Sequence, residues 1–117
     1  MKNCTCAISK EKNNLNNKAM TKEKIIEAFQ TFLSESSKQR YSDFYVGITN
    51  DVDRRLFGEH NVDKEHWGWI YAQANDKNVA QLVEEYFLNK GMKGDTGGGT
   101  DDTVYVYCYE IRSYTVE

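Results

Sequence analysis

Apolar residues near the start of the chain recur every three or four positions, the spacing of one face of a helix. This face comprises Ile25, Ile26, Phe29, Phe32 and Leu33. Thr21 precedes it and is a preferred N-cap residue, while residues 34–39 are polar. We therefore predict a first helix that begins after Thr21 and ends at the polar segment.

A second apolar set has the same spacing and predicts the clearest helix of the chain, over residues 79–90. Its members are Val79, Leu82, Val83, Tyr86 and Phe87. Gly91 follows directly, at a position where glycine commonly ends a helix in the left-handed conformation. The helix is therefore expected to end there.

A shorter helix is predicted between these two. Val52 and Leu56 lie four residues apart and would both face the core. Either Asn50 or Asp51 is expected to cap its N-terminus, and Gly58 is expected to mark its end.

Three segments rich in β-branched and aromatic residues predict strands. They span about residues 41–48, 67–72 and 103–111. In the last segment, period-two alternation predicts one face that carries Tyr105, Tyr107, Tyr109 and Ile111. Helices and strands alternate along the chain, which predicts a small α+β domain with a mixed or antiparallel three-stranded sheet flanked by helices.

The ends of the elements suggest how the chain is organised. Residues 1–20 are rich in Asn and Lys and show no periodicity, which predicts a disordered leader. Residues 21–117 then form a single domain, whose first helix covers one face or edge of the sheet. The glycine-rich residues 94–102 do not match a phosphate-binding loop, because no lysine and hydroxyl pair follows the glycines. We expect a mobile connection there, of the kind that can act as a lid.

Charge divides the chain into two unlike parts. Residues 1–40 hold eight Lys or Arg and four Asp or Glu, a balance of +4, whereas residues 41–117 hold seven and fourteen, a balance of −7. The overall charge is −3. An acidic body repels a phosphate backbone unless a local basic groove or bound cations compensate. A nucleic-acid enzyme would therefore need such a groove, and the candidates for it are Arg40, Arg54 and Arg55.

Composition also limits the environment of the protein. No apolar run approaches the roughly 20 residues of a membrane span, and no secretion signal is evident, so we expect a cytoplasmic protein without membrane contact. Cys4 and Cys6 form a C-x-C pair, and Cys108 lies in an apolar strand. The spacing of further Cys and His residues does not complete a zinc site, which favours exposed free thiols at the pair.

The most specific motif spans residues 45–56 and reads YVGITNDVDRRL. A strand end with Tyr45 and Gly47 leads into a helix with the adjacent arginines Arg54 and Arg55, and His60 follows. This pattern closely resembles the second half of the signature of the GIY-YIG nucleases. The resemblance extends over about residues 43–90, through the second strand and the helix that contains Glu84.

The resemblance implies roles for these residues. Arg55, ten residues after Tyr45, stands where such nucleases carry an arginine that binds a phosphate oxygen and stabilises charge in the transition state. Tyr45 would orient or deprotonate the attacking water. His60 corresponds to the family's helix histidine, one residue further along than usual. Glu84 precedes an aromatic-aliphatic run, and it would hold one Mg²⁺ or Mn²⁺ ion that in turn binds the scissile phosphate.

Two features of that family are not evident in the sequence. The Gly-Ile-Tyr strand should precede Tyr45 by about ten residues, where the chain instead reads as the end of a helix. The asparagine expected after the glutamate helix is replaced by the glycine-rich segment. We predict that the C-terminal strand fills the vacant position in the sheet, and that Tyr105 or Tyr107 supplies the missing phenol.

Two functions follow from these observations. The first is a metal-dependent endonuclease that cleaves phosphodiester bonds of DNA, in which Tyr45, Arg55 and Glu84 converge on one site. The alternative is a catalytically inactive relative that binds DNA or a protein partner. On that reading Arg54 and Arg55 would pair with Asp51 or Asp53 on a solvated face, Glu84 would be exposed, and the Trp67, Trp69 and tyrosine side chains would serve packing alone.

Overall fold

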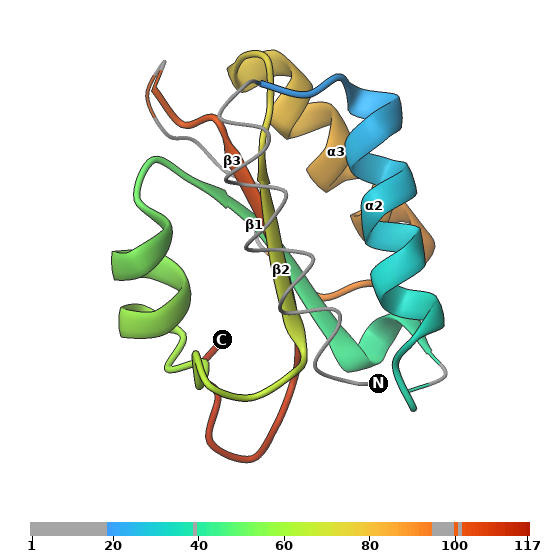
Figure 1. Cartoon of the computed structure of the whole chain (residues 1–117), viewed down its shortest axis with the longest axis vertical. Coiled ribbons are helices and arrows are strands. Elements are labelled where there is room, and N and C mark those ends of the chain that lie inside the picture. Colours follow the sequence, from blue (N-terminus) through green and yellow to red (C-terminus); the bar gives the residue numbers. More distant parts are fainter. Residues whose placement is uncertain (1–18, 39, 95–99, 101) are drawn as a thin grey trace.

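A three-stranded antiparallel sheet lies at the centre of the fold (Figure 1). Its strands are β1 (Phe44–Thr49), β2 (Trp69–Gln73) and β3 (Tyr105–Glu110), in the order β1-β3-β2. The C-terminal strand therefore occupies the middle of the sheet and pairs with both of its neighbours. This confirms the predicted α+β class. Of the two predicted sheet types, mixed and antiparallel, the sheet is antiparallel.

The structure is a computed structural model that describes residues 19–38, 40–94, 100 and 102–117. The predictions for Cys4 and Cys6, for residues 1–18 of the leader and for most of the glycine-rich segment lie outside these residues. The end of the predicted leader is described, however, and is paired. The N–H of Met20 donates to the carbonyl of Gln73 at 2.8 Å, and its own carbonyl accepts from Asn75 at 3.0 Å.

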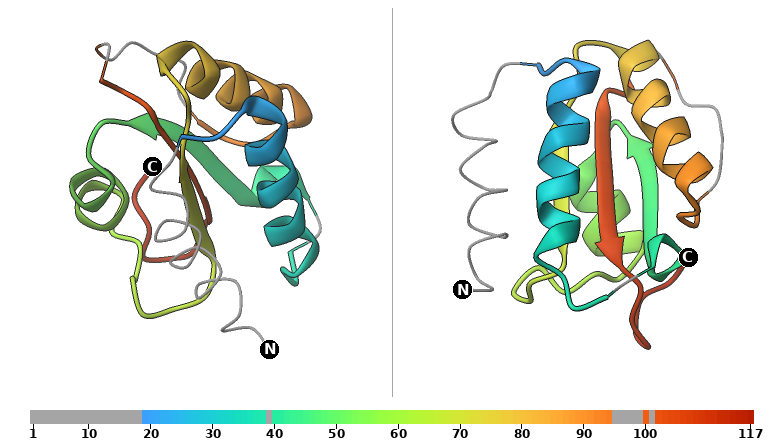
Figure 2. Two further views of the ribbon diagram at one scale, coloured as in Figure 1. Left: turned by 45° about the horizontal axis from the view of Figure 1, so that its top comes forward. Right: turned by 90° about the vertical axis from the view of Figure 1, so that its right-hand side faces the viewer.

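Two helices cover one face of the sheet, as both views in Figure 2 show. Helix α2 (Lys22–Ser34) begins at Thr21, whose hydroxyl accepts from the N–H of Lys24, and it buries Ile25, Phe29 and Phe32. Helix α3 (Lys77–Lys90) is capped by Asp76 and ends at Gly91, whose φ of 116° lies in the left-handed region. The N-cap of α2 and the C-terminal glycine of α3 are where the residue pattern predicts them, whereas α3 begins two residues before its predicted start.

The opposite face of the sheet is covered by a short helix and by the segment after β3 (Figure 2). This short helix, η2 (Asp53–Glu59), is a π-helix in which the N–H of His60 donates to the carbonyl of Arg55, five residues earlier, at 2.9 Å. Leu56 is fully buried beneath it. The face of the sheet beneath α2 and α3 is therefore built from aliphatic and phenylalanine side chains. The face beneath η2 is built largely from tyrosines.

Some predicted boundaries are wrong by a few residues. Residues Tyr41–Asp43 form a 3₁₀ turn, η1, before β1 rather than its first residues. Gly58 lies inside η2 and not at its end, because the wider π-helical turn continues to Glu59. Trp67 precedes β2 and stacks on Phe32, with ring centroids 5.3 Å apart. Its role is packing, as expected for the tryptophans.

No helix in the described part of the chain combines the length and apolar character that crossing a bilayer requires.

Candidate active site

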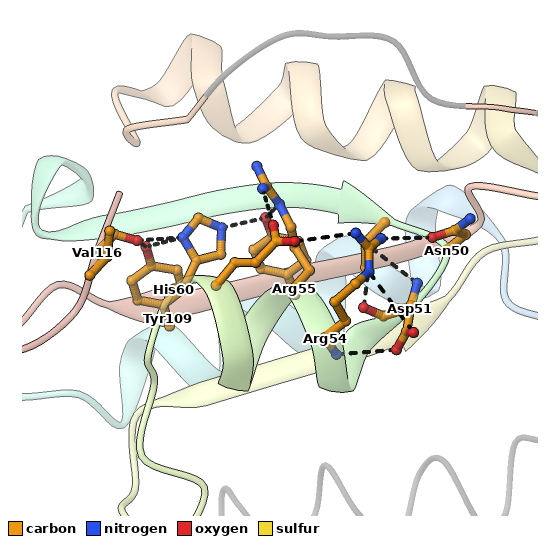
Figure 3. A network of polar contacts seen from close by, with 10 residues as sticks. Asn50, Asp51, Arg54, Arg55, His60, Tyr109 and Val116 are labelled. Atoms are coloured by element: carbon orange, nitrogen blue, oxygen red, sulfur yellow. Dashed lines mark hydrogen bonds and ion pairs between the residues drawn. The ribbon is translucent and has the colours of Figure 1, made fainter.

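Tyr107 of β3 is the centre of the candidate site. Its ring is 1% exposed, and its hydroxyl oxygen lies 2.8 Å from Nε2 of His60 and 3.3 Å from Nε of Arg55. Figure 3 shows Arg55 and His60 projecting from the short helix toward the sheet. Tyr107, from the last strand, is therefore in direct contact with two predicted site residues of the motif, Arg55 and His60.

The Tyr107 ring lies over Gly47, its direct partner on β1. A Cβ atom at position 47 would be 2.5 Å from Cζ of Tyr107, closer than real carbon atoms approach. The glycine of the Tyr-x-Gly motif thus creates the space that the phenol fills. This contact joins the Tyr-x-Gly motif on β1 to the C-terminal strand β3.

His60 is held on both sides of its ring. Nε2 faces Tyr107, whereas Nδ1 lies 2.6 Å from the carbonyl oxygen of Val116 and 3.0 Å from the hydroxyl of Tyr109. Its side chain is almost fully buried, with 2% of the residue exposed. His60 therefore joins the two tyrosines to the segment after β3.

The guanidinium of Arg55 extends from Tyr107 to the surface. Nη1 of Arg55 donates to Oε1 of Glu59 at 2.6 Å, and Nη1 of Arg54 donates to the other oxygen of the same carboxylate at 3.2 Å. Residues four and five positions apart can share one partner here because a π-helix closes its turn at the fifth residue. The predicted pairing of these arginines with Asp51 or Asp53 is only partly right, since Asp51 pairs with Arg54 at 3.9 Å while Asp53 pairs with Lys64.

Tyr45 packs against the same histidine. Its ring centroid lies 4.7 Å from that of His60 and 5.3 Å from that of Tyr109, and the residue is 4% exposed. The predicted site residue Tyr45 therefore lies beside His60 and packs its ring against the imidazole.

The protonation states follow from burial and from the neighbouring charges. Burial raises the pKa of Tyr107, against the opposing effect of Arg55. Burial also lowers the pKa of His60, and the positive charge of Arg55 lowers it further. The hydrogen bond between Arg55 and Glu59 raises the pKa of the guanidinium and lowers the pKa of the carboxyl. Near neutral pH the site therefore holds a neutral phenol, a neutral imidazole and an ion pair.

Glu84 lies on α3, the helix that packs along the edge strand β1. The residue is 3% exposed, so the alternative of an exposed carboxylate on the outer face of the helix is wrong. Its negative charge contributes to the raised pKa of Tyr107. The charge of Glu84 therefore acts on the same phenol that Arg55 and His60 contact.

The donor set limits which metal could bind. Among the described residues, no group of three or more His, Cys, Asp or Glu side chains is arranged to hold a metal ion. A centre made of protein ligands alone therefore does not fit this part of the chain. Mg²⁺ is commonly held by one or two carboxylates together with waters and substrate phosphates, and the one carboxylate of Glu84 fits that arrangement.

Tyr105 and Tyr109 of β3 have different surroundings from those that the sequence predicts. Tyr105, predicted as an alternative to Tyr107, instead makes an edge-on contact with Tyr71, with ring centroids 6.4 Å apart. Tyr109 was not among the predicted site residues, although it contacts His60 directly. Period-two alternation puts all three tyrosines on one face, but only the strand register identifies those opposite Tyr45 and Gly47.

Glu59 and Val116 are the other contacts that the motif did not reveal. Glu59 lies four residues after Arg55, a spacing typical of helical ion pairs, so a search for charge pairs would have found it. The Val116 contact is made by a backbone carbonyl, for which the sequence offers no signal.

The predicted basic groove does not include Arg40. This arginine precedes η1 at the start of β1 and forms an exposed pair with Asp43 at 3.7 Å. Arg54 binds Asn50, which follows the other end of β1, at 3.1 Å (Figure 3). The positive charges that the structure places beside Tyr107 and His60 are those of Arg54 and Arg55, which share the Glu59 carboxylate.

Comparison of the chain with protein-family models, with curated proteins and with solved structures gave no match. The relationship to GIY-YIG nucleases therefore remains a prediction that depends on the motif and on the contacts described above.

Proposed function

We propose that this protein is a metal-dependent endonuclease whose site is a rearranged form of the GIY-YIG arrangement. One observation carries the proposal. The phenol of Tyr107, from the last strand, lies over Gly47 of the Tyr-x-Gly motif and contacts both Arg55 and His60. A phenol, a guanidinium and an imidazole are groups that phosphodiester hydrolysis can use, and here the phenol contacts the other two. The buried carboxylate of Glu84 acts on the same phenol through its charge.

Each side chain has a chemical role in this proposal. Arg55, whose side chain is 34% exposed, would exchange Glu59 for a phosphate oxygen and stabilise charge developing in the transition state. The Tyr107 oxygen would accept a proton from the attacking water while its own proton passes to Nε2 of His60. Tyr45 would hold the imidazole by packing against it. Glu84 would hold the Mg²⁺ or Mn²⁺ ion, which when bound neutralises phosphate charge.

Catalysis by Tyr107 depends on this proton transfer, because burial disfavours a free phenolate. Passing the phenolic proton to His60 as the water proton arrives keeps Tyr107 neutral throughout. The cost is a protonated His60 near Arg55, whose charge lowers the pKa of the imidazole. Binding of an anionic phosphate to Arg55 would offset that cost.

The second candidate function is a module that binds DNA or a protein without cleaving it. It is favoured over cleavage by the Glu59 carboxylate already bound to both arginines. The balance of −7 over residues 41–117 favours a protein over DNA as the partner. Such a module would use Arg54 and Arg55 as its cationic contacts, while the tyrosine cluster would serve packing alone.

Cleavage of plasmid and branched DNA in Mg²⁺ or Mn²⁺ tests the proposal when two matched pairs of variants are compared. Tyr107→Phe and Tyr105→Phe remove the same hydroxyl from the same face of β3, but only Tyr107 contacts Arg55 and His60. We expect Tyr107→Phe to lose roughly 10²–10⁴-fold in rate, the usual contribution of a general acid or base. Tyr105→Phe should stay close to wild type.

The second pair consists of Glu84→Gln and Glu85→Gln, which are neighbours on α3 and differ in burial. Only Glu84→Gln should abolish the metal-dependent cleavage. If the wild type cuts neither substrate, or if cutting survives both Tyr107→Phe and Glu84→Gln as a contaminant's would, the endonuclease proposal is wrong. DNA binding without cleavage would then support the second candidate.

A further inference from the structure

The segment after β3 folds back onto His60 and is bonded to it twice. The N–H of Val116 donates to the backbone carbonyl of His60 at 2.8 Å, and the carbonyl oxygen of Val116 lies 2.6 Å from Nδ1 of the same residue (Figure 3). Nearby, the Asn61 amide donates to the carbonyl of Tyr114 at 3.0 Å. Val116 is therefore held in register with His60 by its own backbone and by a neighbouring contact.

A backbone carbonyl can only accept a hydrogen bond, so Nδ1 must carry the proton in this contact. In a neutral imidazole the other nitrogen, Nε2, then has a lone pair and accepts. Its partner at 2.8 Å is the hydroxyl of Tyr107, which must donate. The Val116 carbonyl oxygen, on the other side of the His60 ring, thus determines that Tyr107 is the donor in its hydrogen bond with Nε2.

We propose that the carbonyl of Val116 fixes His60 as its Nδ1–H tautomer and thereby orients the Tyr107 hydroxyl as a donor to Nε2. Val116 is a positioning residue in this scheme, since it acts on the reaction only through His60. The catalytic meaning of the arrangement rests on the proposed function, whereas the tautomer itself does not.

The remaining contacts of the cluster agree with this assignment. With its proton directed at His60, the oxygen of Tyr107 presents its lone pairs to the Nε–H of Arg55 at 3.3 Å and to an incoming water. Tyr109 donates to the same Val116 carbonyl at 3.4 Å, and its oxygen, 3.0 Å from Nδ1, accepts from that nitrogen. The opposite tautomer would set the lone pair of Nδ1 against the carbonyl oxygen at 2.6 Å, which is repulsive.

The orientation has a chemical consequence. When a water proton moves to the Tyr107 oxygen, the bond between that oxygen and its own proton breaks, and the proton joins Nε2 of His60. One proton enters and one leaves, so the phenol ends neutral and the imidazole becomes the imidazolium. In the other tautomer Nε2 already carries a proton and cannot accept one, so the transfer is blocked.

The tautomer can be read directly from the nitrogen chemical shifts of His60 in two-bond proton–nitrogen NMR correlation spectra. The chain has only two histidines, and His66→Gln leaves His60 as the single signal. His66 is exposed and pairs with Asp63 at 2.9 Å on the surface, so we expect this background substitution to be mild. We expect a pyrrole-like shift for Nδ1 and a pyridine-like shift for Nε2 near pH 7.

Two truncations in that background separate the Val116 carbonyl from the rest of the segment. A chain that ends at Val116 keeps the acceptor, and it should keep the Nδ1–H tautomer. A chain that ends at Tyr114 keeps the contact with Asn61 but lacks the acceptor. It should show a mixture of tautomers, together with a cleavage loss within the roughly 10²–10⁴-fold range of acid–base catalysis.

Tyr107→Phe tests the proposal without disturbing the segment. Because Val116 sets the tautomer, the Nδ1–H form should persist when the Tyr107 hydroxyl is removed. A wild-type ring in the Nε2–H form, a switch of tautomer in Tyr107→Phe, or an unchanged tautomer in the chain ending at Tyr114 would each overturn the proposal. The expected tautomers without any DNA cleavage would instead reject the proposed function and leave this inference intact.

Discussion

At the scale of single residues, the site depends on the absence of a side chain at Gly47, next to the large ring of Tyr107. Gly47 leaves the surface of β1 open, and the Tyr107 phenol fills that opening and reaches Arg55 and His60. Because interiors are close-packed, even one added carbon at position 47 must move the phenol or the strand. The glycine of the motif is therefore explained by packing.

Gly47→Ala should accordingly destabilise the protein by about 1–3 kcal/mol, the usual cost of overpacking. Gly58→Ala is the matched control, since its Cβ would meet only the Asp53 carbonyl at 3.6 Å, and alanine is favoured over glycine in a helix by about 0.5–1 kcal/mol. Chemical denaturation of the two variants measures both effects. Equal stabilities for the two variants would contradict the close contact between Gly47 and Tyr107.

A second residue-scale prediction concerns pH. Burial lowers the pKa of His60 in the folded state below its ordinary value of 6.5, so the unfolded chain takes up the proton first as pH falls. The free energy of unfolding should therefore decline as pH drops below 6.5 and through the folded pKa. The ionisable groups around the ring are Arg55 and Glu59 on η2, Tyr45 on β1, Tyr107 and Tyr109 on β3, and Glu117.

Thermal or urea unfolding between pH 7.5 and 5.5 measures this decline. His60→Asn should flatten it, whereas His66→Gln, at an exposed histidine, should leave it unchanged. A decline in His60→Asn as steep as in wild type would assign the proton uptake to another group.

At the scale of elements, local signals placed the two long helices correctly but not the type of the short one. Thr21, Asp76 and Gly91 act through their own backbones and nearest neighbours, so their effect can be read from sequence. Val52 and Leu56 fit an α-helical spacing, yet residues 53–59 form a π-helix. That wider turn brings Arg54 and Arg55 under one carboxylate, which helical spacing alone does not predict.

The cap of α3 gives a prediction at this scale. The Asp76 carboxylate accepts from the N–H of Val79 at 2.9 Å, so Asp76→Ala should cost about 1 kcal/mol of stability. Asp76→Asn keeps an acceptor and should lose much less. Urea denaturation of the pair measures the difference, and similar losses in both variants would show that the cap contributes little.

At the scale of the whole molecule, the described residues leave only a small local positive site on an acidic body. Arg54 and Arg55 lie together on η2, and Arg40 lies at the other end of β1. DNA that docks on the site would therefore displace few counterions. Because each neutralised phosphate contributes about −0.9 to the salt slope, two arginine contacts predict a slope of about −1.8 in a plot of log K against log [salt].

Fluorescence anisotropy with a labelled duplex at several salt concentrations tests this prediction. Arg54→Ala should make the slope shallower by about 1. Glu59→Gln should bind more tightly than Glu65→Gln, since both remove one negative charge but only Glu59 occupies the arginines. A slope several times steeper than about −1.8 would place the DNA on a different and broader basic surface.

The sequence was sufficient for the features that depend on neighbours along the chain. Helix ends, the alternating faces of the last strand and the α+β class all follow from spacing, caps and propensity, which act over a few residues. The motif that resembles the GIY-YIG signature also contains Tyr45, Arg55 and His60, which contact Tyr107 or the imidazole in the fold.

Contacts between distant segments needed the folded chain. The middle position of β3, its register against Gly47, the choice of Tyr107 over Tyr105 and the bond from Val116 to His60 join residues more than about thirty positions apart. Period two makes the tyrosines of β3 equivalent, and a backbone carbonyl has no sequence signature. Tertiary packing alone selects among them, because a given register lets only one phenol fill the space above a glycine.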